Sequence, residues 1–347
     1  MSLRSYSNPR LFMGKIEIEN FSSITYKNSG GNKVSSLSIK LEDPQMSGAA
    51  FLGKEVIFYL NYGSTDTTPF FRGFIKEYKP SDKAISITAY DVLTFLAGIE
   101  SPPLVITDTY NFDGFTLAQM LHDYIERVVN KNKVRIGLSM LNDTDPPVTL
   151  AGYRSNSIHP LKIIQAKIPQ DKSAISDIKT YRLMVRDDGN KSNICFVKEQ
   201  DINSRGIAFS FNDGIEKLDY KRRPSPNYYT LEVDGSIMEY QHNSLPTGIV
   251  TGKITKKDFK YPDEARQEAF FEATAAEDKK EITITTNKGH YLELGNVVSV
   301  FTPEYPEITG KHRVLGKDVS VGKSKVTCKL KLNRESPTVS DYLVRIN

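Results

Sequence analysis

The chain has 347 residues, a length that suggests about two or three domains. Hydrophobic residues make up 39% and charged residues 25%, which excludes the composition of a disordered chain. The net charge of +4 is too small a surplus to indicate nucleic-acid binding by itself. No apolar run approaches the ~20 residues of a membrane-spanning helix, and the first residues lack the apolar core of a secretory signal. Cys195 and Cys328 lie far apart in strand-like patterns, so we expect two buried thiols rather than a disulfide scaffold.

The first third, residues 1–98, is predicted to form a small antiparallel β-barrel or sandwich. Apolar residues alternate with polar ones in most of its segments, which is typical of strands with one buried face. Turn residues separate the segments at 28–32 and 80–83. The expected strands cover residues 15–19, 36–41, 56–60, 70–78 and 84–90.

The middle part, residues 99–226, is predicted to be a mixed α/β insertion. Its clearest element is a helix over 116–129, where apolar residues recur with helical spacing and Thr116 with Gln119 fits a capping box. His122 falls on the polar face of this helix and is expected to face solvent. A short helix near 173–180 and a hairpin over 182–198 follow, and the basic, proline-containing stretch 221–226 has the composition of a linker.

The last part, residues 227–336, is predicted to be a second small β-barrel, followed by a C-terminal tail over 337–347. One helix interrupts it near 262–279, where Pro262 and two acidic residues precede spaced alanines. The remaining segments alternate as strands do. These strands are expected over 281–286, 296–301, 311–319 and 325–332.

The first and last parts resemble each other in the order of their elements. Each contains a Leu-Gly turn, an apolar strand, a strand led by glycine, a short turn and an alternating strand. Any two β-meanders can share such an order, but we favour an internal repeat of two related barrels separated by an insertion. The glycines expected to shape the turns in both copies are Gly53, Gly73, Gly295 and Gly310.

No motif in the sequence indicates catalysis. The five histidines show no zinc-binding spacing, and residues 142–145 resemble the start of a calcium loop but lack its central glycine and terminal glutamate. Ser320 and Lys323 match S-x-x-K by letter only, since they fall on an expected turn. No carboxylate pair stands out for glycoside hydrolysis. We therefore predict a protein that is not an enzyme, with no catalytic, cofactor-binding or metal-binding residues.

The final expected strand carries Lys325, Lys329 and Lys331 on one face, opposite an apolar face. The simplest interpretation is a solvated outer face, where lysines also protect a sheet edge from aggregation. The alternative is a contact with a phosphate backbone or an acidic partner.

Several segments resemble phage tail hub proteins, which are related to the hubs of type VI secretion spike proteins. In the first part these are LEDP (41–44), the Leu-Gly turn at 52–53, FRGFI (71–75) and ISITAYD (85–91). In the last part the segments GHYLELG (289–295) and ITGKHRVL (308–315) resemble the second barrel of the same hubs. These are strand and turn patterns rather than catalytic signatures.

The resemblance implies two barrels like those of the tail tube in each chain, joined by insertion domains. Three such chains would form a homotrimeric ring whose six barrels match the sixfold tail tube and which leaves a channel for the genome. Because lysines lining this channel would slow passing DNA, we expect Lys325, Lys329 and Lys331 to contact a neighbouring subunit or to lie on the outer surface. It implies contacts with the tail tube protein, a separate central spike protein, and tape measure and wedge or distal tail proteins, with DNA only in transit and no membrane segment. The expected location is the tail or baseplate of a virion assembled in the host cytoplasm. The alternatives are the hub of a non-contractile tail and, less favoured, a viral carbohydrate-active or glycan-binding β-protein.

Overall fold

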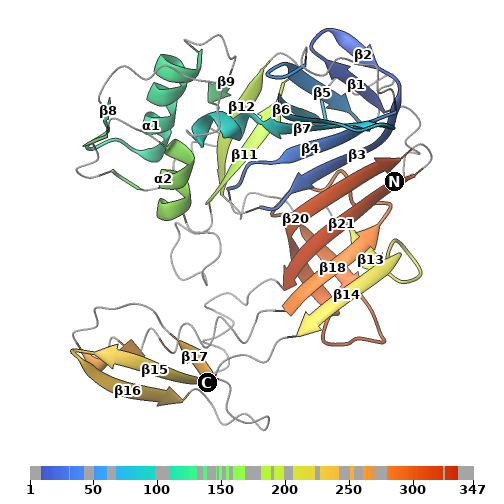
Figure 1. Ribbon diagram of the computed structural model, residues 1–347. Helices are drawn as coiled ribbons and strands as arrows, with labels where there is room; N and C mark the ends of the chain where they lie inside the picture. Colours follow the sequence, from blue (N-terminus) through green and yellow to red (C-terminus); the bar gives the residue numbers. More distant parts are fainter. Residues whose placement is uncertain are drawn as a thin grey trace.

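The computed structural model (Figure 1) shows a large β-sheet with an α/β insertion at one end and a separate small sheet. The elements below refer to the residues that the structure describes. These are residues 9–30, 32–42, 51–60, 68–97, 110–130, 136–138, 146, 148–150, 154–155, 159–168, 181–188, 191–198, 206–222, 227–241, 251–253, 261–263, 265–266, 269, 280–322 and 325–334.

The first part contributes seven strands to the large sheet, in the spatial order β3-β4-β7-β6-β5-β1-β2. Every neighbouring pair is antiparallel, and apolar residues alternate into the core, as in β4 with Leu37, Ile39 and Leu41 buried. The strands are β1 (Arg10–Met13), β2 (Ile16–Ile18), β3 (Phe21–Asn28), β4 (Ser36–Leu41), β5 (Glu55–Tyr59), β6 (Phe71–Pro80) and β7 (Ile85–Asp91).

The other strands of the same sheet lie within residues 208–222 and 280–334, which together are called the last part from here on. Their order is β14-β18-β21-β20, and β19 pairs with both β20 and β13. The strands are β13 (Ala208–Ser210), β14 (Lys217–Arg222), β18 (Lys280–Thr286), β19 (Val297–Phe301), β20 (Gly310–Gly322) and β21 (Val326–Arg334).

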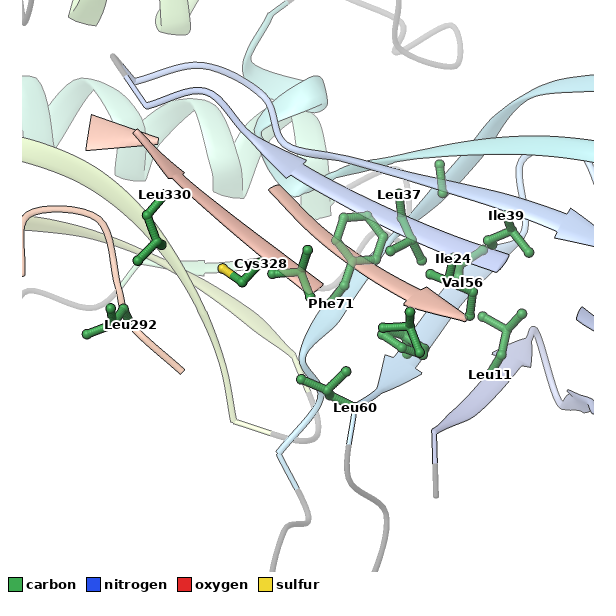
Figure 2. Packing of buried hydrophobic residues seen from close by; sticks show 14 of the residues in the cluster. Leu11, Ile24, Leu37, Ile39, Val56, Leu60, Phe71, Leu292, Cys328 and Leu330 are labelled. Carbon is green, nitrogen blue, oxygen red and sulfur yellow. The ribbon is translucent and has the colours of Figure 1, made fainter. Parts of the chain in front are cut away.

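The two parts are joined by the antiparallel pairing of β20 with β3, which we call the seam. Its register runs from Lys317 opposite Asn28 to Gly322 opposite Ser23. One hydrophobic core continues across it, and Figure 2 shows Leu292 and Cys328 of the last part in the same cluster as Phe71 of the first. In the described part of the chain the strands form one curved sheet rather than two closed barrels.

Strand pairing confirms the internal repeat. The Gly53 N–H donates to the Ile75 carbonyl (2.9 Å), and the register of β6 against β7 shifts directly after Ile75. The Gly295 N–H donates to the Val314 carbonyl (2.8 Å), and the register of β20 against β21 shifts directly after Val314. Each half has the same turn contact, the same bulge and the same antiparallel order, so β3-β4-β7-β6-β5 corresponds to β14-β18-β21-β20-β19.

The insertion has its own core between two helices and a small sheet. Helix α1 (Leu117–Tyr124) begins at the expected capping box and continues into a π-helical turn over Ile125–Val129. A 3₁₀ turn (Val92–Leu96) leads out of β7 into this core. The other elements are α2 (Pro160–Lys167), the sheet β11 (Tyr181–Asp187), β12 (Ser192–Lys198) and β9 (Ile136–Leu138), and the pair β8 (Tyr110–Asn111) and β10 (Arg154–Ser155).

A further three-stranded sheet lies outside the large one. It consists of β15 (Tyr228–Val233), β16 (Ser236–Gln241) and β17 (Thr251–Lys253), and its small core includes the buried residues Ala265 and Ala269. Residues 262–263, 265–266 and 269 are helical, in agreement with the helix expected there. The rest of that helix, the short helix near 173–180 and the tail 337–347 lie outside the described residues.

The prediction of a mainly β protein with a small α/β insertion is confirmed, and both cysteines are buried free thiols. His122 is exposed, as expected. Two details of the organisation differ from expectation. Strands β13 and β14 belong to the large sheet although they precede residue 226, and the described residues 228–241 and 251–253 form a separate sheet rather than strands of a second barrel. The strand β3 was not predicted, because Ile24 is its only fully buried residue.

Gly30 provides a test of how closely the two halves approach at the seam. It has a φ of +68°, and a Cβ atom there would lie 2.1 Å from the backbone oxygen of Leu315. We expect Gly30→Ala to lower the free energy of unfolding by about 1–2 kcal/mol for the left-handed backbone, plus a further loss from the forced separation. The matched control is Gly206→Ala, with a φ of +61° and no atom within 4 Å of the added Cβ. Equal losses in denaturant titrations of the two variants would contradict close packing at the seam.

Candidate functional site

The seam and the insertion meet at a cavity of about 280 Å³. Its walls come from strands β3, β6, β7, β11, β12 and β20, and from the segments that follow β3 and β18. Many of its polar side chains are charged, which is unusual for a place where three parts of a chain pack together. The charged residues of the walls are Lys33, Arg72, Asp91, Arg182, Arg186, Asp187, Glu293 and Lys317.

Lys317 of β20 is a buried cation of this junction, with only 8% of its surface exposed. Its Nζ donates hydrogen bonds to the backbone oxygens of His290 (2.9 Å) and Leu292 (2.7 Å). The same atom lies 5.8 Å from the ring centre of Tyr26 and 5.2 Å from that of Phe70. Backbone carbonyls of the last part and aromatic rings of the first part therefore hold one ammonium group between them.

Burial also changes the titration of the groups around this lysine. It lowers the pKa of Lys317 to about 8, against the opposing attraction of Cys328 and Glu293. Burial, together with the charge of Lys317, lowers the pKa of His290 to about 4. Burial raises the pKa of the Cys328 thiol to about 12. At neutral pH the junction thus contains a charged lysine beside a neutral imidazole and a protonated thiol.

Asn32 connects the first part to the insertion. It is buried and has a φ of +55°, a conformation that asparagine tolerates better than most residues. Its Oδ1 accepts a hydrogen bond from the Leu183 N–H (2.8 Å), and its backbone oxygen accepts one from Gln165 Nε2 (2.9 Å). One residue in the β3–β4 loop therefore contacts both α2 and β11.

Ion pairs complete the junction. Arg72 Nε lies 2.7 Å from Asp187 Oδ2, and both side chains are less than one-tenth exposed. Arg186 pairs with Glu293 at 3.4 Å, linking the insertion to the last part. Asp91 accepts hydrogen bonds from the backbone N–H groups of Ser35 (2.9 Å) and Leu93 (3.1 Å), while burial raises its pKa to about 6. These contacts fix the three parts relative to one another.

Within the described ranges, no group of three or more potential ligand side chains is arranged to hold a metal ion. In the same ranges no helix is long and apolar enough to cross a membrane. The calcium-like segment 142–145 lies outside the described residues.

The three predicted interface lysines lie on or beside β21. Cys328, Leu330 and Leu332 fill the buried face of this strand, while Lys329 and Lys331 are exposed on the other. Lys325 directly precedes the strand and pairs with Glu216 at 3.0 Å. All three lysines are therefore exposed in the single chain, and none of them lines the cavity at the junction.

The four predicted turn glycines separate into three kinds. Gly53 and Gly295 occupy turns with φ values of +76° and +88°, where glycine is favoured. Gly310, with a φ of +146°, begins β20. The prediction of a turn at Gly73 was wrong: it lies inside β6, and a Cβ there would lie 2.2 Å from the Tyr90 oxygen, so close strand packing explains this glycine.

The pKa of Lys317 gives a testable pH dependence. Its pKa is about 8 in the folded chain and 10.5 in the unfolded one, so the unfolded state binds more protons between these values. The contribution of Lys317 to the free energy of unfolding should therefore rise with pH over this window, by on the order of 3 kcal/mol in total. Lys317→Met should remove this rise, whereas Lys311→Met, an exposed position of the same strand, should keep it. Denaturant titrations from pH 7 to 11 measure the difference, and parallel pH curves for the two variants would refute the assignment.

No protein-family model matches the sequence. A search of curated proteins also finds no match.

Solved structures do match. A tail protein from Neisseria meningitidis MC58 has a TM-score of 0.60 and 11% identity, with 94% of this chain and 96% of that chain covered. The 43 kDa tail protein of prophage MuSo2 from Shewanella oneidensis has a TM-score of 0.62 and 11% identity, with 94% and 97% covered. A component of the Escherichia coli type VI secretion system, itself described as similar to the T4 bacteriophage tail proteins gp27 and gp5, has a TM-score of 0.54 and 9% identity, with 91% and 74% covered.

These likenesses extend over nearly the whole chain, although few residues are identical. They agree with the strand and turn patterns noted in the sequence and with the two related halves seen in the sheet. The chain has the fold of these phage tail proteins and of the type VI secretion component.

Proposed function

We propose that this chain is a structural hub protein of a phage tail or of a related contractile injection device. The observation that carries the proposal is the presence of two related halves joined side by side in one sheet. The shared fold with phage tail proteins supports it. In this role the protein acts by assembly and not by chemistry, and it resides in the tail or baseplate of the virion.

Three copies would form a ring. Three chains with two related units each give a ring of six units, so one face of the ring can match a sixfold tail tube while the opposite face matches a threefold central spike. The ring would leave a channel for the genome. The insertion, with the exposed polar face of α1, would cover the outside of this ring, and tape measure and wedge or distal tail proteins would make further contacts.

Three exposed lysines, Lys325, Lys329 and Lys331, are proposed to stabilise this assembly. Lys329 and Lys331 are exposed on β21, which lies in the middle of the last part of the sheet. Acidic groups of a neighbouring copy or of the tube protein would provide a salt-dependent attraction.

The test is the mass of the assembled complex, measured by native mass spectrometry and sedimentation on the chain alone and with the tail tube protein. We expect three copies per ring, and rings of two, four or six copies would overturn the proposal.

Replacing Lys325, Lys329 and Lys331 with Glu should reduce ring formation or tube docking at low salt, and the difference from the unmodified chain should shrink as salt is added. The control makes the same charge change on the insertion, at Lys162, Lys167 and Lys191, which are also exposed. An equal loss in both variants would remove the special role of the β21 lysines.

A further inference from the structure

The seam inside the chain uses two particular edges. One is the edge of the long strand β20 beyond its bulge, and the other is the edge of β3, the outermost strand of the five-strand repeat in the first half. In its register Asp318 lies opposite Lys27, and Val319 lies opposite Tyr26. The second unit of the chain therefore binds the first unit through nonidentical surfaces.

The internal repeat supplies a second copy of each edge. In the first half, Ile75 of β6 lies opposite Ala89 of β7, and Ala89 lies opposite Leu37 of β4. Leu37 in turn lies opposite Tyr26 of β3. In the second half, Val314 of β20 corresponds to Ile75, and the same path of opposite residues across β21 and β18 ends at Tyr220 of β14. The two paths end on the same residue type. When residues are counted along β6 from Ile75 and along β20 from Val314, Lys79 and Pro80 correspond to Asp318 and Val319, which lie at the seam.

Both second copies lie at sheet edges in the described part of the chain. β14 ends the spatial order of the sheet, and beyond Ile75 β6 forms a ladder with β7 alone. The Tyr26 hydroxyl at the seam accepts a hydrogen bond from Asn28 Nδ2 (3.1 Å). The Tyr220 hydroxyl is buried and has no hydrogen-bond partner among the described residues. An edge strand with an apolar, aromatic inner face is a template for pairing with another chain.

We propose that β14 of one copy pairs with the β6 edge of the next copy, in the register of the internal seam. Lys79 then lies opposite Lys221, and Pro80 lies opposite Tyr220. This inference rests on the self-assembly in the proposed function and gives it a specific contact. Because the contact joins different surfaces, it repeats from copy to copy and closes a ring when the rotation permits. Three copies would alternate three internal seams with three seams between chains.

The seam between chains is weaker than the internal one, and the sequence shows why. Opposite charges, Asp318 and Lys27, face each other across the internal seam, whereas two lysines face each other across the proposed one. Like charges opposite each other on neighbouring strands are destabilising. Pro80 also lacks an N–H to donate. Lysine and proline protect the edge of the free chain from unspecific pairing, so the contact forms only where the rest of the ring aligns it.

Charge reversal tests the register. Lys79→Asp recreates the charge pair of the internal seam and should strengthen ring formation by about two- to fivefold per contact. Lys221→Asp alone should act in the same direction, and the double variant should return to or fall below the unmodified level. Lys191→Asp on the exposed turn of the insertion is the control and should leave ring formation unchanged. Sedimentation over a concentration series measures each variant, and purely additive effects in the double variant would overturn the proposed register.

A disulfide tests the contact itself. Directly opposite residues of antiparallel strands have Cα atoms about 4.5–5.5 Å apart, within the range of about 4.4–6.8 Å that a disulfide spans. A chain carrying Lys79→Cys and Lys221→Cys, oxidised with diamide, should give a covalently closed trimer. The control pair, Lys79→Cys with Lys217→Cys, places the thiols about 13 Å apart along the strand and should not cross-link.

The outcomes separate this contact from the proposed function. Trimers that form without cross-linking at 79 and 221 would overturn the contact and leave the hub proposal intact. Cross-linked chains longer than three copies would support the contact and contradict the closed ring. A chain that neither trimerises nor cross-links would overturn both.

Discussion

The structure depends on the pairing of β20 with β3. This pairing turns two related sheets into one, and it places the loop after β3 against the bulge of β20. Without it each half would expose an edge strand and part of an apolar core that now continues from Leu11 to Leu332. The insertion contacts both halves at this place, through Asn32 on one side and Glu293 on the other. The relative position of all three parts thus follows from one strand pair.

The buried lysine at the seam shows how the junction is held in one arrangement. Hydrophobic packing alone tolerates sliding of one strand past another, because a leucine finds apolar neighbours in many registers. The Lys317 ammonium group finds two carbonyl oxygens and two aromatic rings only in the observed register. The cost of its desolvation appears in its lowered pKa. We interpret this cation as a device for a unique alignment of the two halves rather than for stability.

The sequence indicated the strands with strong alternation and the repeat marked by Gly53 and Gly295, because these signals are local. It did not indicate β3, which has the polar sequence FSSITYKN, or the membership of β14, with KLDYKR, in the large sheet. Both strands obtain their stability from neighbours distant in sequence, which no local pattern encodes. The junction was missed for the same reason. Lys317 lies in a segment that alternates like any half-exposed strand, and only the fold reveals that its polar position faces inward.

The seam also sets the order in which the chain completes its structure during synthesis. β3 ends at Asn28, while its partner strand begins near Gly310, about 280 residues later. At about 5–20 residues per second, a ribosome needs roughly 15–60 seconds to make the intervening chain. During that time β3 can pair with β4 on one side, while its other edge has no partner strand. A chain interrupted before β20 would keep the β3 edge unpaired. The edge is therefore covered only in chains whose translation has continued through β20.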